Sequence, residues 1–430
     1  MAINITVANR LSRRAFLTGM AGACTPSLSG ALKDRSALLE ELERRACLYF
    51  YEQGHPVTGL VLDRVRVDGV DERRIASTAA TGFGLSALCI ADQRGYLKRG
   101  VAEQRAERTL DFFARRVFRQ KGFYFHFLDC VTGERAFQCE LSSVDTAWLL
   151  CGVLHAREHF DKGRIRRLAN EILGRVEWGW MLAEGATLCH GWTPEHEFLP
   201  YRWDEYSELL AMYLLAIGST TFPIPASSWD AWTRPNRVSE SGDLYVESRA
   251  SLFAHQYSHA WFNFRDKQDG WADYFRNSTE ATARHREFCI SLKVRFPWFG
   301  EDMWGISASD SRYGYMDWGG PRTIATSKID GTLVPCAAGG SIVFLPEECG
   351  RVLDLMIDRY GSRVWTRYGF VDAFHPQDGW YGPDVVAINL GIMLLMAENL
   401  RTGSVWETIM STPEASRGFT AAGFYNPKTL

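Results

Sequence analysis

The amino-acid sequence predicts an all-α protein, folded as an (α/α)6 barrel of six inner and six outer helices with a small β-hairpin insertion. Apolar helical segments begin near residues 79, 145, 208, 257, 338 and 387. Helices with one charged face lie between them, as expected if an outer layer covers an inner one. The alternative is an α-solenoid, but the intervals are too long and irregular for TPR or HEAT units.

The stretch from Phe198 to Ser219 contains the clearest inner helix. From Leu209 to Ile217 every residue is apolar except for the hydroxyl of Tyr213, so we expect protein to surround this helix on all faces. The run is too short to cross a membrane. Glu205 and Glu208 are three residues apart, which would place both on one helical face.

The other elements follow from the same patterns. Residues 38–53, 100–116, 163–183, 274–292 and 347–360 have one charged face and are predicted to be outer helices. Residues 79–97, 145–160, 255–264, 337–345 and 384–400 are predicted inner helices. Residues 122–139 alternate aromatic side chains around Thr132 and Gly133, which predicts the β-hairpin.

Composition excludes several classes of function. Apolar residues make up 46% of the 430 residues and aromatic residues 13%, which is enough for a large core and for aromatic walls around a sugar. The net charge is −3 and there is no long basic run, which argues against a nucleic-acid partner. No apolar stretch reaches the length of a membrane span. We expect a monomer with one catalytic domain over residues 36–430.

The first 35 residues are predicted to be a signal peptide and linker. Ser12-Arg13-Arg14-Ala15-Phe16-Leu17 and the small residues after it resemble a twin-arginine export signal, which predicts a periplasmic or secreted protein. The ten cysteines have no CxxC pair or zinc-like spacing. Cys130 and Cys139 flank the predicted hairpin and are candidates for a disulfide.

The predicted barrel would bring polar side chains together at one rim. Its inner helices run in the same direction, so the residues at their starts would converge with the aromatic loops before them. Carboxylates and aromatic rings around one cleft are typical of carbohydrate-processing sites. The residues expected at the helix starts are Thr81, Asp145, Glu208, His259 and Asn389.

Glycosidic bond cleavage needs two carboxyl groups, and Glu208 and Asp372 are the candidates. Glu208 is the predicted proton donor, and Asp372 the predicted base. Asp145 is a second candidate, although Ser143 or Asp145 would equally suit a helix cap. The expected substrate contacts are Asp145, Glu140, Tyr201, Trp203, Tyr206, His259, Trp298, Trp304, Asp310 and Trp380.

No cofactor or metal is predicted. His255 and His259 are four residues apart, but the glutamate of the HExxH zinc motif is missing. The chain has neither a GxSxG elbow nor a P-loop. The partner expected from these observations is an oligosaccharide or polysaccharide.

Four segments resemble the glucoamylase-like family of bacterial proteins, which includes endo-β-1,2-glucanases and a domain of cyclic β-1,2-glucan synthases. The resemblance covers roughly residues 38 to 410. It implies an (α/α)6 barrel that hydrolyses β-1,2-linked glucans by an inverting mechanism, with Glu208 as acid, Asp372 as base and Asp145 in the substrate cleft. The segments are ELSSVDTAWLLCGVL, YSELLAMYLLAIGS, WGISASDSRYGY and GPDVVAINLGIMLLMAENLRTG.

A non-hydrolytic glycan-binding or transglycosylating protein on the same fold is the alternative function. The loops over residues 227–245 and 375–380 do not follow the pattern of the family. Such loops determine the linkage and chain length that a glycan-binding site accepts. A phosphorylase is a third, weaker possibility, because nothing in the sequence suggests phosphate dependence.

Overall fold

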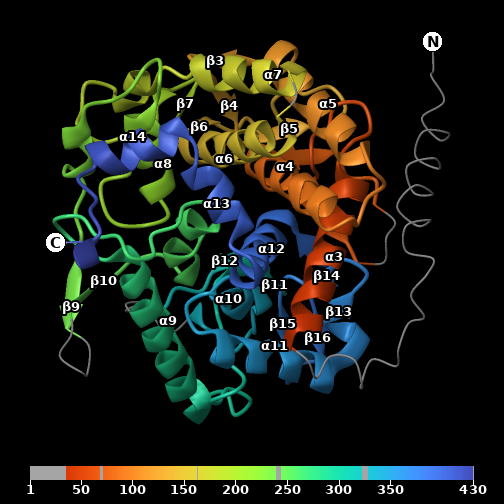
Figure 1. Ribbon diagram of the computed structural model, residues 1–430. Helices are drawn as coiled ribbons and strands as arrows, with labels where there is room; N and C mark the ends of the chain where they lie inside the picture. Colours follow the sequence, from red (N-terminus) through yellow and green to blue (C-terminus); the bar gives the residue numbers. More distant parts are fainter. Residues whose placement is uncertain (1–34, 68–70, 162, 239–243, 322–327, 430) are drawn as a thin grey trace.

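The computed structural model describes residues 35–67, 71–161, 163–238, 244–321 and 328–429 (Figure 1). It is rich in helices, as the sequence predicts. The helices are α3 (Arg35–Gln53), α4 (Thr78–Gln93), α5 (Val101–Arg115), α6 (Ser143–Phe160), α7 (Gly163–Gly174), α8 (Leu210–Gly218), α9 (Tyr274–Ser291), α10 (Pro335–Gly339), α11 (Pro346–Tyr360), α12 (Ala387–Arg401), α13 (Ser404–Met410) and α14 (Pro413–Ala421).

The apolar helices contact one another in a closed series. Helix α12 packs on α4, α4 on α6, and α6 on α8. The short 3-10 helix η4 (Tyr257–Ala260) contacts both α8 and α12, and α10 also contacts α12. The remaining helices pack outside this series, with α3 against α4 and α12, α5 against α4 and α7, and α14 against α8 (Figure 1).

Helices α4 and α6 approach most closely where two glycines face each other. A Cβ atom built on Gly152 would lie 2.1 Å from the carbonyl oxygen of Gly82, and one on Gly82 would lie 2.2 Å from the carbonyl oxygen of Trp148. Because backbone atoms occupy that space, only glycine fits at these positions without moving a helix.

Helix α8 is buried along its whole length, which confirms the apolar run as an inner helix. Its predicted start is wrong, because the helix begins at Leu210 and Glu208 lies in the turn before it. The preceding residues are held in a non-helical conformation by Thr233. Tyr206 donates its main-chain N–H to the Thr233 carbonyl, and Thr233 donates to the Asp204 carbonyl. Glu205 and Glu208 therefore do not share a helical face.

Of two other predicted inner helices, one is absent as an α-helix and one is shorter than expected. Residues 255–264 form no α-helix; η3 (Leu252–His255) and η4 are 3-10 turns. The main-chain N–H of His259 bonds the Gln256 carbonyl, three residues back, rather than one four residues back. The predicted helix over residues 337–345 is replaced by the five-residue α10.

The β-structure is more extensive than one hairpin. The turn at Thr132 and Gly133 is present, with Gly133 donating to the Asp129 carbonyl. The segments around this turn pair with each other through an antiparallel bridge between Leu128 and Arg135, which confirms a short hairpin, and its first strand also pairs with residues 75–77. Strands β3 (Arg119–Gln120), β4 (Phe123–Phe125), β6 (Leu141–Ser142), β7 (Gly191–Thr193) and β8 (Glu197–Phe198) form one antiparallel sheet in that order.

The other strands form two-stranded antiparallel sheets. These are β1 (Arg64–Arg66) with β17 (Asp384–Val386), β2 (Ile75–Ser77) with β5 (Phe127–Asp129), β9 (Asn236–Val238) with β10 (Leu244–Val246), β11 (Ala308–Ser311) with β12 (Gly314–Asp317), β13 (Trp365–Thr366) with β14 (Gly369–Phe370), and β15 (Phe374–His375) with β16 (Trp380–Tyr381).

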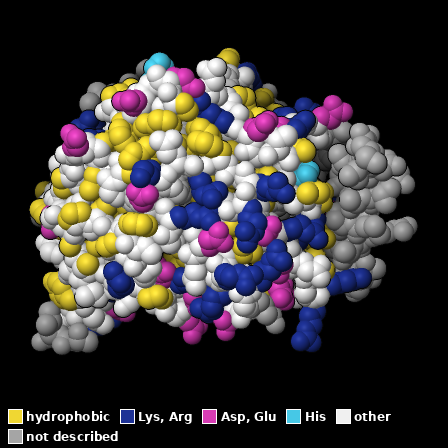
Figure 2. Space-filling view, turned by 90° about the horizontal axis from the view of Figure 1, so that it is seen from above, with side chains coloured by type: hydrophobic (Ala, Val, Ile, Leu, Met, Phe, Trp, Pro, Cys, Tyr) yellow, Lys and Arg dark blue, Asp and Glu magenta, His cyan; other side chains and the backbone are white. Residues whose placement is uncertain are grey.

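The outer helices carry paired charges. Arg164 on α7 bonds Asp111 on α5 at 3.0 Å, and Arg115 bonds the same carboxylate at 3.0 Å. Figure 2 shows the face seen from above Figure 1, where basic side chains gather with carboxylates between them. Such exposed pairs each contribute little to stability.

The cysteines within the described ranges are all free thiols, so the expected pairing of Cys130 with Cys139 is wrong. Cys139 instead accepts the Phe127 main-chain N–H at 3.2 Å. The predicted signal and Cys24 lie outside the described residues. Among the residues that the structure describes, no helix is both long enough and apolar enough to span a membrane.

Candidate active site

Glu208 is a half-buried carboxylic acid in the turn that leads into α8. Ser258 fixes this turn, because its hydroxyl donates to the Glu208 carbonyl at 2.7 Å and accepts the Ala211 main-chain N–H at 3.0 Å. Burial, followed by the charges of Asp145 and Asp317, raises the pKa of Glu208 to about 7. The side chain can therefore hold a proton near neutral pH, as a general acid must.

Asp372 lies just before β15 and is 4% exposed. Asn389, in the first turn of α12, donates from Nδ2 to Oδ1 of Asp372 at 2.7 Å, and the main-chain N–H of Asp310 donates to Oδ2 at 2.6 Å. Burial first, and then the charge of Asp310, raises the pKa of Asp372 to about 7. The hydrogen bonds favour the ionised form and so limit the rise.

Tyr257 and Ser258, neighbours in η4, connect these two acids. The Tyr257 hydroxyl donates to Oδ1 of Asn389 at 3.2 Å, and Asn389 in turn bonds Asp372. Burial raises the pKa of Tyr257 well above its usual value, and the charges that add to this effect include those of both Asp372 and Glu208. The segments that carry the two predicted catalytic acids are therefore both bonded, directly or through Asn389, to η4.

Arg64 supports the Asp372 side of the site. This residue of β1 bonds Oδ1 of Asp310 from Nη1 at 2.5 Å and Oδ2 of Asp63 from Nε at 3.0 Å. Its charge lowers the pKa of Asp372, in opposition to that of Asp310. Sequence reasoning missed Arg64 because nothing in its surrounding loop sequence links it to residue 310.

A second cluster joins His126, Glu140 and Asp145. Nδ1 of His126 lies 3.1 Å from Glu140 Oε1, and its Nε2 lies 3.5 Å from Asp145 Oδ1. Burial disfavours the imidazolium, but the charge of Asp145 and the hydrogen bond and charge of Glu140 raise the pKa of His126 to about 9. The cation in turn keeps the pKa of Glu140 below its usual value, against the effect of burial.

Asp145 is the buried member of this cluster. Burial raises its pKa, whereas the charge of His126 and the Ser142 hydroxyl, which donates at 2.5 Å, favour the ionised form. The cap of α6 is Ser142, which accepts the Asp145 N–H, so the alternative of Ser143 or Asp145 as the cap is wrong. The Asp145 carboxylate is thus not used to cap the helix and faces His126 and Ser142 instead.

The same three side chains could in principle share a cation, since one ligand atom of each lies within 4.8 Å of the others. A protonated imidazole has no lone pair for a metal, however, and both His126 nitrogens face carboxylates. The arrangement fits a charge-compensated hydrogen-bonded cluster better than a metal site.

The remaining predicted substrate-binding residues differ in how exposed they are to solvent. Tyr201 is 66% exposed, and Trp298, Trp380 and Glu140 are half-buried. Trp203 is largely buried and donates from its indole to the Ser143 hydroxyl at 2.9 Å, near the start of α6.

Three predicted contacts are core residues, so the structure contradicts a direct role in substrate binding. Tyr206, His259 and Trp304 are at most 1% exposed. His259 packs its ring against Phe264 and Phe344 and bonds the Ser278 hydroxyl. The prediction failed because residues 255–264 form no inner helix with a polar start at the rim.

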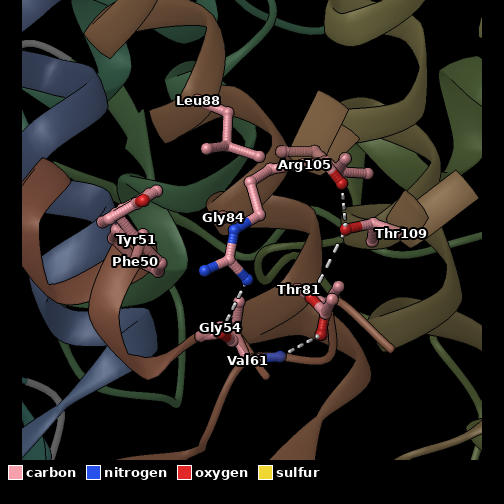
Figure 3. Close-up of a pocket in the computed structure, with 11 residues that line it drawn as sticks. Phe50, Tyr51, Gly54, Val61, Thr81, Gly84, Leu88, Arg105 and Thr109 are labelled. Atoms are coloured by element: carbon pink, nitrogen blue, oxygen red, sulfur yellow. Dashed lines mark hydrogen bonds between the residues drawn. The ribbon is translucent and has the colours of Figure 1, made fainter. Parts of the chain in front are cut away.

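A small internal cavity of about 20 Å³ lies apart from these acids, between α3, α4 and α5. Arg105 reaches into it and donates to the Gly54 carbonyl at 3.3 Å (Figure 3). The space is about the size of one water molecule. It is too small for a sugar ring.

Comparison with known proteins identifies a matching family model and a curated relative. Residues 200–413 match the family model described as "Putative glucoamylase". An exo β-1,2-glucooligosaccharide sophorohydrolase (non-reducing end) of Parabacteroides distasonis is 25% identical over 419 residues, covering 89% of this chain. The match spans only 57% of that curated relative's length.

Solved structures match over nearly the whole chain. An endo-β-1,2-glucanase from Chitinophaga pinensis, in complex with sophorotriose and glucose, is 27% identical with a TM-score of 0.82, covering 92% of this chain and 99% of that one. A "putative glucoamylase" from Bacteroides fragilis is 28% identical with a TM-score of 0.83, covering 94% and 100%. In sequence over residues 200–413, and in structure over nearly its whole length, the chain is therefore similar to the glucoamylase-like family.

Proposed function

We propose that the protein is a glycoside hydrolase that cleaves β-1,2-glucan or its oligosaccharides by an inverting acid/base mechanism. Glu208 is the general acid and Asp372 the general base. The observation that supports this proposal is the set of hydrogen bonds that joins the Glu208 turn to Ser258, and Asp372 through Asn389 to the neighbouring Tyr257. Burial also raises the pKa of both acids to about 7. Paired carboxyl groups are what glycosidic hydrolysis requires.

The protonation states suit these roles near neutral pH. Protonated Glu208 would donate its proton to the leaving glycosidic oxygen, while ionised Asp372 would accept a proton from the attacking water, directly or through a substrate hydroxyl. Asp372 is 4% exposed and both its oxygens already accept hydrogen bonds. A carboxylate so enclosed is better suited to accepting a proton than to attacking the anomeric carbon, which favours inversion.

The β-1,2 linkage is proposed from the relatives. Their printed names specify endo-β-1,2-glucanase and β-1,2-glucooligosaccharide sophorohydrolase activities. The buried polar groups around the two acids are consistent with a sugar substrate, whose hydroxyl groups need many hydrogen-bond partners. Among the expected substrate contacts, Asp310 bonds Asp372 through its main-chain N–H, and the charge of Asp145 acts on Glu208.

We also propose an (α/α)6 barrel over a single domain of residues 36–430. Its support is the closed series of contacts through α12, α4, α6, α8 and η4, with further helices packed outside. In this arrangement η4 and α10 would take the places of two inner helices. The twin-arginine-like segment Ser12–Leu17 supports export to the periplasm or outside the cell, and we expect the mature protein to act as a monomer.

The test is the release of reducing ends from linear β-1,2-glucan by Glu208→Gln. Loss of the general acid should lower the rate by about 10²–10⁴-fold. Glu205→Gln is the matched control, because Glu205 is a nearby acid that pairs instead with Arg249 at 2.8 Å, and it should retain activity.

Each other outcome of this assay has a defined meaning. Unchanged release by Glu208→Gln would refute its role as the acid. New chain lengths without net reducing ends, from the unmodified protein, would indicate transglycosylation. Binding with neither result would indicate a glycan-binding protein.

A further inference from the structure

An open depression of about 360 Å³ lies beside the Asp372 segment and is not used by the chemistry described above. Its walls come from four separate parts of the chain, residues 295–298, 312–313, 330–332 and 375–380. The lining combines aromatic rings with charged side chains. Its main members are Trp298, Arg312, Tyr313, His375, Asp378 and Trp380.

His375 fixes one wall of this depression. Its Nε2–H donates to the Asp330 carbonyl at 3.0 Å, and its Nδ1 accepts the main-chain N–H of Asp378 at 3.2 Å. The loop that carries Asp378 and Trp380 is therefore held against the segment around Asp330.

Trp298 is held equally firmly. Its indole N–H donates to the Gly331 carbonyl at 2.8 Å, and its ring meets that of His375 edge-on with centroids 5.1 Å apart. Gly331 has a φ of +97°, and a Cβ there would lie 2.4 Å from the Trp298 ring. Glycine at this position thus leaves room for the tryptophan, and the aromatic wall is formed before any ligand arrives.

Two short hairpins connect the lining of the depression to the Asp372 side of the site. In the β11–β12 hairpin, the Asp310 main-chain N–H donates to Asp372, and Arg312 and Tyr313 in the following turn line the depression. In the second, Asp372 lies two residues before β15, whose His375 pairs with Trp380. The depression therefore lies beside the segments that hold Asp310 and Asp372, on the side where a longer chain would continue.

We propose that this depression binds glucose units of the glucan beyond those held between the two catalytic acids, so that the enzyme prefers longer chains. The proposal rests on the proposed function and specifies the substrate's length. The ligand class is a neutral oligosaccharide: Arg312 pairs with Asp378 at 2.9 Å, and the further lining charges are Arg295 and Asp330. Cations and carboxylates therefore balance, and aromatic faces offer the flat apolar surfaces on which sugar rings stack.

The test compares kcat/KM for long linear β-1,2-glucan with kcat/KM for sophorotriose. Trp380→Ala should lower the ratio of the two values about tenfold, as is typical when a binding tryptophan is truncated. Tyr313→Ala should lower it in the same direction. Because Tyr313 is 81% exposed, this second variant keeps the test valid if Trp380→Ala folds poorly.

Trp271→Ala is the matched control. Trp271 is another accessible tryptophan, 55% exposed, and its indole donates to Asp230, outside the lining of the depression. This variant should leave the ratio unchanged. Equal losses on both substrates in Trp380→Ala and Tyr313→Ala, or no loss in either, would overturn the proposal.

Binding to Glu208→Gln separates this proposal from the proposed function. Titration of its tryptophan fluorescence with the same two glycans should give tighter binding of the long chain, and adding Trp380→Ala should remove that difference. If the unmodified protein hydrolyses neither glycan but this binding pattern holds, the depression is a glycan subsite and the proposed reaction is wrong. If hydrolysis occurs but both variants retain the long-chain preference, the reaction stands and the subsite is wrong.

Discussion

Asn389 donates a hydrogen bond of 2.7 Å from Nδ2 to Oδ1 of Asp372, and its own Oδ1 accepts the hydroxyl of Tyr257. The amide therefore has a fixed orientation, because a flipped amide would oppose two acceptors at one end and two donors at the other. Helix α12 provides this side chain from its first turn. The base is thus oriented by a helix that packs on both η4 and α4.

Replacing Asn389 with alanine should move the acidic limb of the pH profile to higher pH. The lost hydrogen bond favours the ionised form of Asp372, so its pKa should rise above about 7, and the base would become active only at higher pH. We expect the acidic limb of kcat/KM to shift upward by about one pH unit. Measuring kcat/KM for β-1,2-glucan across pH checks this.

Asn399→Ala is the control for that experiment. Asn399 is also buried on α12, but it donates to the Ala260 carbonyl at 2.8 Å and does not contact Asp372. It should lower thermal stability and leave the acidic limb in place. A shift of the same size in both variants would mean that helix packing, and not the hydrogen bond, sets the profile.

Glu208→Gln should stabilise the protein at alkaline pH. The pKa of Glu208 is raised from 4.5 to about 7 in the folded protein, so the unfolded chain ionises first. The stability that the protonated acid contributes is therefore present at low pH and lost as pH rises from about 4.5 to about 7. Glutamine has no such dependence. The melting temperature of Glu208→Gln should exceed that of the unmodified protein at pH 8 and match it near pH 4. A difference in melting temperature that does not change with pH would contradict this.

The sequence predicted the features that depend on local pattern. The run from Leu209 to Ile217 is apolar on all faces, so its burial could be predicted without knowing its neighbours. The start of the helix could not be predicted in the same way. It is set by hydrogen bonds to Thr233, a residue more than twenty positions away in a loop with no recognisable pattern.

The candidate site shows the same limit. Glu208 and Asp372 could be chosen because they stand at the edges of recognisable motifs. His126 could not, because it lies in an aromatic run that reads as strand, and its partners Glu140 and Asp145 belong to a later segment. His259 was misjudged for the opposite reason, since a polar residue in an apolar run was taken for a rim residue and is instead a core histidine bonded to Ser278.

His126→Gln should weaken substrate binding. The imidazolium compensates the charges of Glu140 and Asp145, so its loss should raise the pKa of both carboxyls and make them poorer acceptors for sugar hydroxyls. We expect KM for β-1,2-glucan to increase about tenfold, from the loss of charge-assisted hydrogen bonds. His159→Gln is the control, because His159 also faces a carboxylate, that of Asp92 at 3.1 Å, on a different part of α6.

The effect of His126→Gln on thermal stability should also depend on pH. The pKa of His126 is raised from 6.5 to about 9 on folding, so its stabilising contribution is present below about pH 6.5 and lost as pH rises through about 9. The melting temperature of His126→Gln should therefore fall below that of the unmodified protein at pH 6 and approach it near pH 10. A deficit that grew with pH would rule out a protonated His126.

Gly152→Ala should strongly destabilise the fold by forcing α4 and α6 apart. The added Cβ would lie 2.1 Å from the Gly82 carbonyl oxygen, and both groups belong to helix backbones that cannot move independently. We expect a loss of about 3 kcal/mol in the free energy of unfolding, at the upper end for overpacked cores.

Gly163→Ala, at the start of α7, is the control because a Cβ there meets nothing within 4 Å. It should change stability by less than about 1 kcal/mol. Chemical denaturation of both variants measures the difference, and equal stability of the two would mean that α4 and α6 do not meet through their glycines.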